Sequence, residues 1–353
     1  MKKVGLVGCG SYAHVAQAIK KAIQHIGFDL SAFENKNVLL KPNLLRPEHP
    51  EKAVTTHPEV VRAMIKIVRA HGGRVSVGDS PAVSTAQNVA KKCGILQVCQ
   101  EHDVPFVDLK TPSTRNGFHV AKELERFDLI VNLPKIKTHI LTGMTCAAKN
   151  LYGCMPGKFK GAGHLMHPSD LGFAELVVRF AQHINPVLTV VDGIVGMEGN
   201  GPGNGTPRDV GVIVASTDAF AADEIVRRII DLDVKEISTS IIVRKRNLLP
   251  SLELLGDPID HYVQEGYVRA RSRFLRYPRS LQRMRKRLFE KRPACDHATC
   301  ILCRRCIKIC PNEVISVQDK KLRFDYSRCI HCFCCHEICP VDAIDLKRPW
   351  QIR

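Results

Sequence analysis

Short apolar runs rich in β-branched residues alternate with longer amphipathic stretches along the first 235 residues. Five of these runs predict β-strands: 38–40, 74–77, 129–131, 188–191 and 212–214. The stretch from Pro58 to His71 predicts a helix, because its apolar residues recur with a period of 3.6. Strands that alternate with helices indicate an α/β fold, a mainly parallel sheet with helices on both faces.

The predicted strands end in polar residues. In open α/β sheets, ligands bind outside the carboxyl ends of the strands. The sequence therefore predicts a substrate-binding site at this edge of the sheet. Its candidate residues are Lys41, Asn43, Asp79, Ser80, Asn132, Lys135 and Asp192. Strand ends also lead into solvent, so each of these residues taken alone is as easily structural as functional.

The segment NLPKIKTH, from Asn132 to His139, is the richest of these strand ends. If it is extended, Lys135, Lys137 and His139 project on one side, because side chains alternate along a strand. Two ammonium groups and an imidazole on one side favour an anion site. We expect Lys41 and Lys149 to complete a hydrated pocket for a small anionic ligand. The alternative is a solvated basic loop.

Two glycine-rich segments carry further hypotheses. The first, from Gly8 to Ala13, fits G-x-G-x-x-A, the first turn of a dinucleotide site, although a plain strand-to-helix turn fits as well. The second, from Asp192 to Pro207, contains six glycines whose backbone amides could hold an anion. Within it, Asp192 and Glu198 are candidates for a divalent cation or substrate hydroxyls; otherwise the segment is a flexible surface loop.

The charge of the chain is unevenly distributed. The net charge is +17, and residues 266–293 alone carry 11 basic residues and one acidic residue. This division predicts three parts: an α/β ligand-binding domain at 1–235, a basic and largely helical linker at 236–293, and a small domain at 294–353. The linker either packs on the first domain or docks on an acidic partner or anionic lipid; nucleic acid is the weakest candidate, because no nucleic-acid-binding motif accompanies the charge.

The small domain contains two copies of C-x2-C-x2-C-x3-C-P, which begin at Cys300 and Cys329. This run is typical of bacterial ferredoxins with two [4Fe–4S] clusters, in which the fourth cysteine of each run binds the other cluster. The pattern predicts two [4Fe–4S] clusters and an α+β ferredoxin-type domain. One cluster is assigned to Cys300, Cys303, Cys306 and Cys339, and the other to Cys329, Cys332, Cys335 and Cys310. Zinc sites and disulfides are the alternatives.

The cluster assignment also bears on location. Thiolates that hold iron must stay reduced, so we expect a cytoplasmic protein. No apolar run of about 18 residues is present, so we expect no transmembrane helix.

Two resemblances extend these predictions. The last 60 residues resemble a bacterial two-cluster ferredoxin. Most of the first 230 residues resemble a family of iron–sulfur proteins described as a domain of unknown function, through these segments: KPNLL from Lys41, THPEVV from Thr56, GDSP from Gly78, NLPKIKTH from Asn132, AKNLYG from Ala148 and DGIVGMEGNGPG from Asp192. They are more distantly similar to the N-terminal part of nickel-pincer lactate racemases. The family resemblance implies no reaction.

Three functions remain open from the sequence. The first is an iron–sulfur oxidoreductase, or its electron-delivering component, in which the clusters exchange electrons with an anionic ligand and with a donor or acceptor protein. The second is an electron carrier that docks on an acidic protein partner. The third is a non-redox isomerase or transferase with structural clusters.

Overall fold

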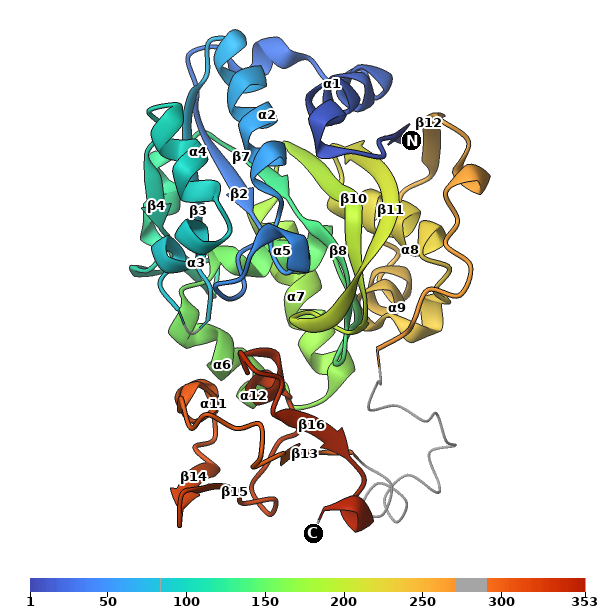
Figure 1. Ribbon diagram of the computed structural model, residues 1–353. Helices are drawn as coiled ribbons and strands as arrows, with labels where there is room; N and C mark the ends of the chain where they lie inside the picture. The colour runs from blue at the N-terminus through green and yellow to red at the C-terminus, as the bar shows by residue number, and fades with distance from the viewer. Residues whose placement is uncertain (83, 271–290, 353) are drawn as a thin grey trace.

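The computed structural model describes residues 1–82, 84–270 and 291–352. Within these residues, ten strands form one twisted sheet and a smaller domain lies against one end of it (Figure 1). The sheet strands are β1 (Lys2–Gly8), β2 (Asn37–Pro42), β3 (Arg74–Asp79), β4 (Phe106–Asp108), β7 (Leu129–Leu133), β8 (Lys135–His139), β9 (Gly143–Thr145), β10 (Leu188–Asn200), β11 (Asn204–Ser216) and β12 (Leu252–Gly256). The strands β5 (Pro112–Arg115) and β6 (Phe118–Ala121) form a separate hairpin.

The sheet has the order β12-β1-β11-β10-β7-β2-β3-β4, and β8 pairs with β10 and β9. Along the main path only β11 runs against its neighbours, so the predicted mainly parallel sheet is confirmed. In β2, Val38 and Leu40 join one apolar cluster while Leu39 joins another. Both faces of the sheet are therefore buried, as period-two alternation requires.

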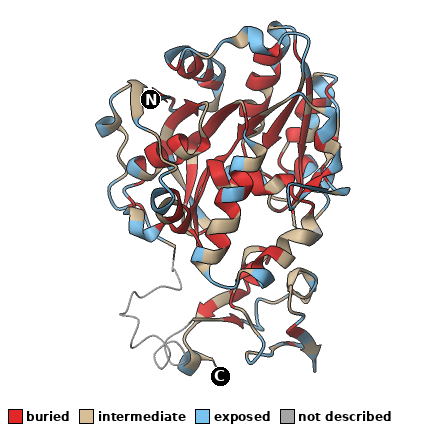
Figure 2. Cartoon of the chain, turned by 180° about the vertical axis from the view of Figure 1, so that it is seen from behind, coloured by how far each residue is buried: buried red, intermediate tan, exposed pale blue. Residues whose placement is uncertain are grey.

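Helices cover both faces. The helices α1 (Val15–His25), α2 (Pro58–Ala70), α3 (Ala86–Lys92) and α4 (Ile95–Glu101) share one apolar cluster with the sheet. The opposite face packs against α5 (Ala147–Leu151), α7 (Asp170–Ile184) and α8 (Ala219–Ile229). The helix α6 (Gly157–Met166) precedes α7 on the side of the small domain (Figure 1). Buried residues concentrate in the sheet and in the helix faces turned toward it (Figure 2).

The α/β domain extends past the predicted boundary at residue 235. The helix α9 (Ser238–Lys245) buries Ile242 and Val243 against α7, and β12 pairs with β1 at the edge of the sheet. These elements belong to the α/β domain rather than to a linker, because they supply apolar contacts and backbone hydrogen bonds to it. Most of the predicted basic helical linker falls at 271–290, outside the described residues.

The dinucleotide hypothesis for the first turn is not supported by the topology. That motif requires a β-α-β unit with adjacent parallel strands. Here β1 lies between β12 and the antiparallel β11, and β2 is several strands away. Gly8 instead lies against Tyr262, since an added Cβ would come 2.1 Å from its hydroxyl oxygen.

The small domain has two similar halves. Its elements are β13 (Arg292–Cys295), α11 (Arg305–Ile309), β14 (Ile315–Gln318), β15 (Lys321–Phe324), α12 (Cys334–Glu337) and β16 (Ile344–Lys347). Three left-handed residues of the first half, Leu302, Arg304 and Glu313, recur 29 positions later as His331, Phe333 and Asp342. The two halves thus share a backbone conformation as well as a cysteine pattern.

Among the described residues, no helix combines the length and the apolar character needed to cross a membrane.

Candidate functional site

The carboxyl ends of β2, β3, β7, β8 and β10 lie at one edge of the sheet. Lys41 is in register with Asn132, and Lys135 is in register with Asp192. The predicted polar residues are therefore neighbours. They form three separate networks, however, rather than one pocket.

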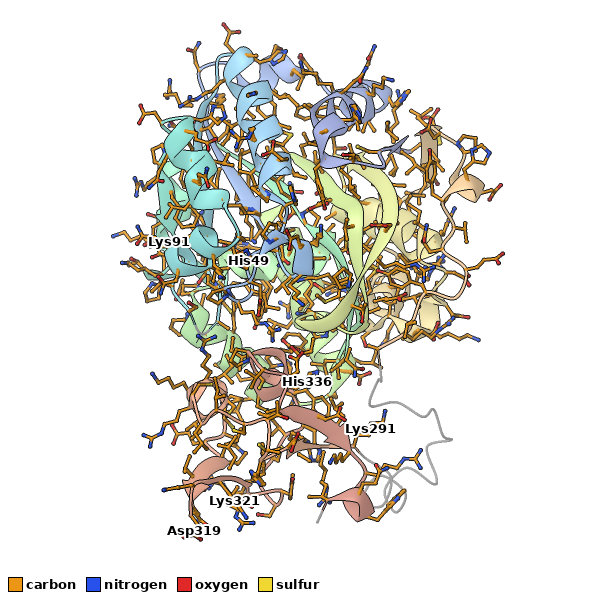
Figure 3. The ribbon with its side chains drawn as sticks, viewed as in Figure 1. His49, Lys91, Lys291, Asp319, Lys321 and His336 are labelled. Atoms are coloured by element: carbon orange, nitrogen blue, oxygen red, sulfur yellow. The ribbon has the colours of Figure 1, made fainter. Side chains whose placement is uncertain are left out.

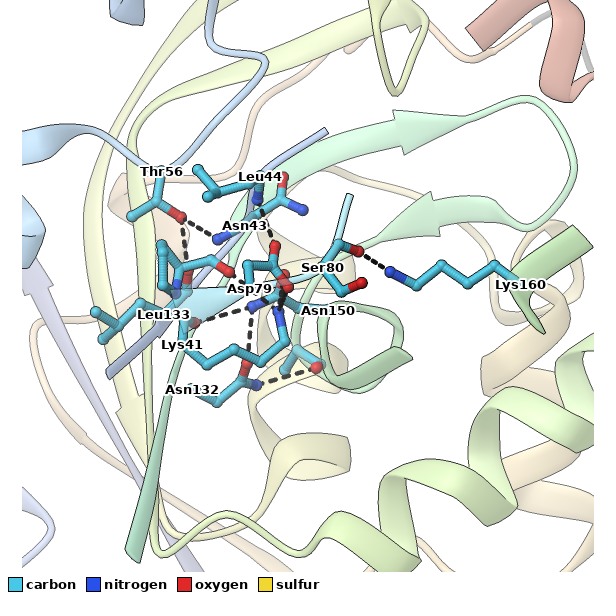
Figure 4. A network of polar contacts seen from close by, with 12 residues as sticks. Lys41, Asn43, Leu44, Thr56, Asp79, Ser80, Asn132, Leu133, Asn150 and Lys160 are labelled. Carbon is cyan, nitrogen blue, oxygen red and sulfur yellow. Dashed lines mark hydrogen bonds and ion pairs between the residues drawn. The ribbon is translucent and has the colours of Figure 1, made fainter. Parts of the chain in front are cut away.

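The first network is centred on Lys41, which is fully buried (Figure 4). Its Nζ lies 2.7 Å from Asp79 Oδ1 and donates to the Pro42 carbonyl at 3.0 Å and to Asn150 Oδ1 at 3.3 Å. Asp79 Oδ2 accepts from the Leu44 amide at 2.8 Å. Lys41 and Asp79 thus neutralise one another inside the domain.

Close packing encloses this ion pair. An added Cβ at Gly153 would lie 2.1 Å from Asp79 Oδ1 and 2.4 Å from Lys41 Nζ, so a larger residue would displace the pair. Beside it, Lys160 donates to the Ser80 carbonyl. Asn150 also donates to Asn132 Oδ1 at 2.8 Å, which connects α5 to the sheet.

The second network is centred on Asp192, which is fully buried. Its carboxylate accepts from Lys135 Nζ at 2.9 Å, from the Tyr12 hydroxyl at 3.0 Å and from the His57 amide at 2.8 Å. Tyr12 stacks on the His57 ring with centroids 3.5 Å apart. Burial lowers the pKa of Lys135 and the charge of Asp192 opposes that change. Asp192 is therefore a structural partner of Lys135.

Asp192 and Glu198 do not form the predicted cation site. Glu198 accepts from Arg208 at 3.3 Å and from the Val268 amide at 3.0 Å, while Asp192 is occupied by Lys135. Among the residues described, no group of three acidic, histidine or cysteine side chains converges on one metal ion. The glycine-rich segment is also no loop, because most of it forms the β10–β11 hairpin.

The third network differs because its lysines have no carboxylate within ion-pairing distance in the described part of the chain. Lys137 Nζ donates to Asn43 Oδ1 at 2.6 Å and to the Val54 carbonyl at 2.8 Å. Burial, followed by the charges of Lys149 and Lys135, lowers the pKa of Lys137 to about 7. Burial also lowers the pKa of Lys149, for which no hydrogen bond within the described residues is found.

His139 borders the same network. Its Nδ1 accepts from the Leu141 and Thr142 amides at 3.0 and 3.2 Å, so the proton of the neutral ring is on Nε2. Nε2 lies 3.3 Å from Glu337 Oε1, without the geometry of a hydrogen bond. Burial lowers the pKa of His139 well below its usual value and raises that of Glu337.

Lys135, Lys137 and His139 do share one side of β8, as the alternation predicts. Ile136 packs in the opposite apolar cluster, and Thr138 donates to β10. The predicted pocket of five cations is nevertheless wrong in part. Lys41 and Lys135 already have internal carboxylates, because Asp79 and Asp192 are their counter-charges rather than ligand-binding groups. Only Lys137 and Lys149 retain unbalanced charge.

The small domain covers this third network. Glu337 comes from α12, and Arg46 of the α/β domain donates to the Cys339 carbonyl at 2.6 Å. Asn204 donates to the His336 carbonyl at 3.0 Å, and an added Cβ at Gly203 would lie 2.7 Å from the Glu337 carbonyl. Figure 3 shows His336 at this junction. The glycines of the hairpin tip thus allow close contact between the two domains.

Two cavities in the small domain are lined by cysteines. One, of about 310 Å³, is lined by Cys300, Cys303, Cys306 and Cys339 together with apolar residues. The other, of about 350 Å³, has Cys310, Cys329, Cys332 and Cys335 in its wall, with Cys334 beside them. Each cavity thus brings together the four cysteines that the sequence assigned to one cluster. Four thiolates around an apolar cavity suit a [4Fe–4S] cluster.

Several residues of the site were not found from the sequence. Tyr12, His57, Arg46, Asn150 and Glu337 come from turns, from a short helix and from the other domain. No periodic pattern marks them. The position of Glu337 inside the second cysteine run was the one available signal that this domain contributes to the site.

Comparisons with known proteins agree with this division. Residues 38–228 match the family model described as "Domain of unknown function (DUF362)". This chain belongs to the DUF362 family. Residues 299–343 of the same DUF362 protein match the model of a 4Fe-4S dicluster domain, so it is an iron–sulfur protein.

One relative of this DUF362 protein is the Thylakoid-associated protein sll1697 of Synechocystis sp. (strain ATCC 27184 / PCC 6803 / Kazusa). It is 39% identical over 231 residues, which cover 64% of this chain and 72% of the relative. Among solved structures, the lactate racemase apoprotein from Thermoanaerobacterium thermosaccharolyticum aligns with a TM-score of 0.42 and 14% identity. That alignment covers 64% of this chain and 56% of the racemase chain.

Proposed function

We propose that this protein couples electron transfer through two [4Fe–4S] clusters to a small anion bound at Lys137 and Lys149. One observation carries the proposal. These two ammonium groups lack a carboxylate partner at the place where α12 of the ferredoxin-type domain covers β8. Buried cations without a counter-charge are unfavourable, and an anion would relieve that cost.

The surroundings of the two lysines suit an anion. Asn43 and the Val54 carbonyl orient the Lys137 ammonium, and His139 presents its Nε2 proton toward the same region. A pKa of about 7 lets Lys137 hold or release a proton near neutral pH. A bound anion would favour the protonated form of Lys137, because an opposite charge stabilises the ammonium.

The ferredoxin-type domain supplies the redox chemistry in this proposal. When bound, each [4Fe–4S] cluster exchanges one electron at a time. An external one-electron carrier protein is the source or the acceptor of these electrons. Arg46, Asn204 and Glu337 keep this domain against the anion site, so binding and electron transfer occur side by side.

The test uses protein purified without air. Iron and sulfide analysis should give roughly eight irons per chain, as expected for two clusters. Thermal melting with a panel of phosphates, carboxylates and nucleotides should then identify a stabilising anion. At about 100 times its dissociation constant, that anion should add roughly 2.7 kcal/mol to the free energy of unfolding. The same anion should change the EPR spectrum of the reduced protein.

Lys137→Met and Lys149→Met should each abolish the melting shift, whereas Lys91→Met should retain it. Lys91 is an exposed lysine on α3 and serves as the matched control. A shift that survives both substitutions would disprove the anion site. A shift without any EPR change would instead favour the non-redox isomerase or transferase.

The cytoplasm remains the compartment that we propose, since the thiolates must stay reduced. The printed name of the relative adds the possibility that this protein associates with a membrane surface.

A further inference from the structure

The two halves of the ferredoxin-type domain share a fold but differ in exposure. Ile301 is 62% exposed, and Arg304 and Lys308 are also exposed. Their counterparts 29 positions later are Ile330, Phe333 and Glu337; the first and third are half-buried and Phe333 is 1% exposed. The second half is covered because Phe333 packs on Ile140 and Glu337 faces His139.

The cysteines follow the same division. Cys303 is exposed, whereas the corresponding Cys332 is half-buried. The cavity lined by Cys303 is therefore closer to solvent at the first half. An electron carrier that approaches from outside reaches this cavity without crossing the α/β domain.

The charges of the two halves are opposite. Residues 300–318 contain three basic residues and one acidic residue, while residues 329–347 contain one basic and three acidic residues. The β14–β15 hairpin adds Lys320, Lys321 and Arg323 on the side of the first half. Figure 3 shows Lys321 at the end of the molecule remote from the α/β domain.

The acidic half already shows how this fold docks. Glu337 lies near His139, and Asp342 lies 3.7 Å from Arg46 of the α/β domain. The basic half has no such partner: no ion pair joins Arg304, Arg305 or Lys308 to any of the described residues. Its exposed Ile301 adds an apolar centre to a cationic rim, the composition of a transient protein-docking surface.

We propose that the first half, residues 300–310 with the β14–β15 hairpin, is the docking face for an acidic one-electron carrier protein. The inference rests on the electron-transfer role proposed above. One electron passes from the reduced carrier, which is oxidised by one electron, to the cluster held by Cys300, Cys303, Cys306 and Cys339, which is reduced by one. No bond forms or breaks in this step.

The test measures the rate at which an acidic flavodoxin, in its hydroquinone form, reduces the holoprotein in stopped flow at low ionic strength. Electrostatic steering accelerates association by about 10- to 1,000-fold. Arg304→Glu combined with Lys308→Glu should therefore slow reduction at least tenfold and remove its dependence on salt. The matched control is Lys20→Glu combined with Lys91→Glu, the same charge change at exposed positions of the α/β domain, which should stay within twofold of wild type.

A second measurement reverses the sign. Reoxidation of the reduced protein by a basic c-type cytochrome should be faster in Arg304→Glu/Lys308→Glu than in wild type. EPR of the reduced variants should show both clusters intact. Equal flavodoxin rates in wild type and Arg304→Glu/Lys308→Glu, or equal slowing in the control, would overturn the docking face. Neither measurement contains the anion, so the anion site can fail while the docking face stands.

Discussion

Lys41 and Lys135 differ from Lys137 and Lys149 although all four are enclosed at the same edge of the sheet. Each of the first two has a carboxylate within 3 Å, Asp79 at 2.7 Å and Asp192 at 2.9 Å. The other two have neutral hydrogen-bonding partners or none within the described residues. The paired lysines connect strands, whereas the unpaired lysines lie where the two domains meet.

This difference separates architecture from function. A buried ion pair is electrically complete, so it needs no ligand. An enclosed ammonium without a carboxylate carries a desolvation cost that folding alone does not recover. Such a cost is commonly retained at sites where a ligand later supplies the missing charge. Substitutions that equalise the two kinds of lysine test this interpretation.

The largest effect should come from breaking a paired lysine. Asp192→Asn leaves the Lys135 ammonium buried with the Tyr12 hydroxyl as its remaining partner. We expect a loss of about 3–5 kcal/mol in the free energy of unfolding, the usual cost of leaving a buried charge uncompensated. Denaturant unfolding measures it. Asp192→Asn combined with Lys135→Met should recover a large part of the loss; a double variant as unstable as the single one would contradict the account.

The sequence predicted the alternation but not the pairing. Period-two spacing places Lys135, Lys137 and His139 on one side of β8, and the βαβ pattern brings Lys41 and Asp192 to the same edge. Which lysine meets which carboxylate depends on strand order, and β8 lies beside β10 rather than continuing β7. Local patterns carry no information on that order. Arg46 and Glu337 were missed because their partners lie 293 and 198 positions away.

The cysteine pattern was more informative because its chemistry is local. Each run contains three of four ligands, and the crossover of the fourth is a property of the motif. The unequal exposure of the two halves was beyond the sequence, since it depends on how the domain packs against β8 and the β10–β11 hairpin. Residues 252–256 were likewise predicted as linker because an isolated edge strand lacks a following helix.

The next effect is a pH dependence specific to Lys137. Its folded pKa of about 7 lies below the roughly 10.4 of an unfolded lysine. Between these values the unfolded chain binds more protons, so the free energy of unfolding rises with pH. The cost of the buried ammonium is full below pH 7 and decreases above it. Wild type should gain about 1.4 kcal/mol per pH unit relative to Lys137→Met between pH 7.5 and 9.

Denaturant unfolding of both proteins at several pH values, without added anion, gives this difference directly. Lys92→Met, an exposed substitution on α3, should follow wild type at every pH. Parallel curves for wild type and Lys137→Met would mean that Lys137 is paired, and the comparison with Lys135 would collapse.

The smallest effect has the opposite sign to the first. Lys149 has no hydrogen bond or ion pair within the described residues, and burial lowers its pKa. Because the residue keeps some contact with solvent, the penalty should be near the lower end of the 1–3 kcal/mol typical for an unsatisfied polar group. Lys149→Met, which retains the aliphatic length, should therefore raise the free energy of unfolding by about 1 kcal/mol without anion. Denaturant unfolding with a stabilising anion should reverse the order, because only wild type gains from the ligand. Destabilisation by Lys149→Met in both conditions would show that this lysine, like Lys135, is part of the architecture.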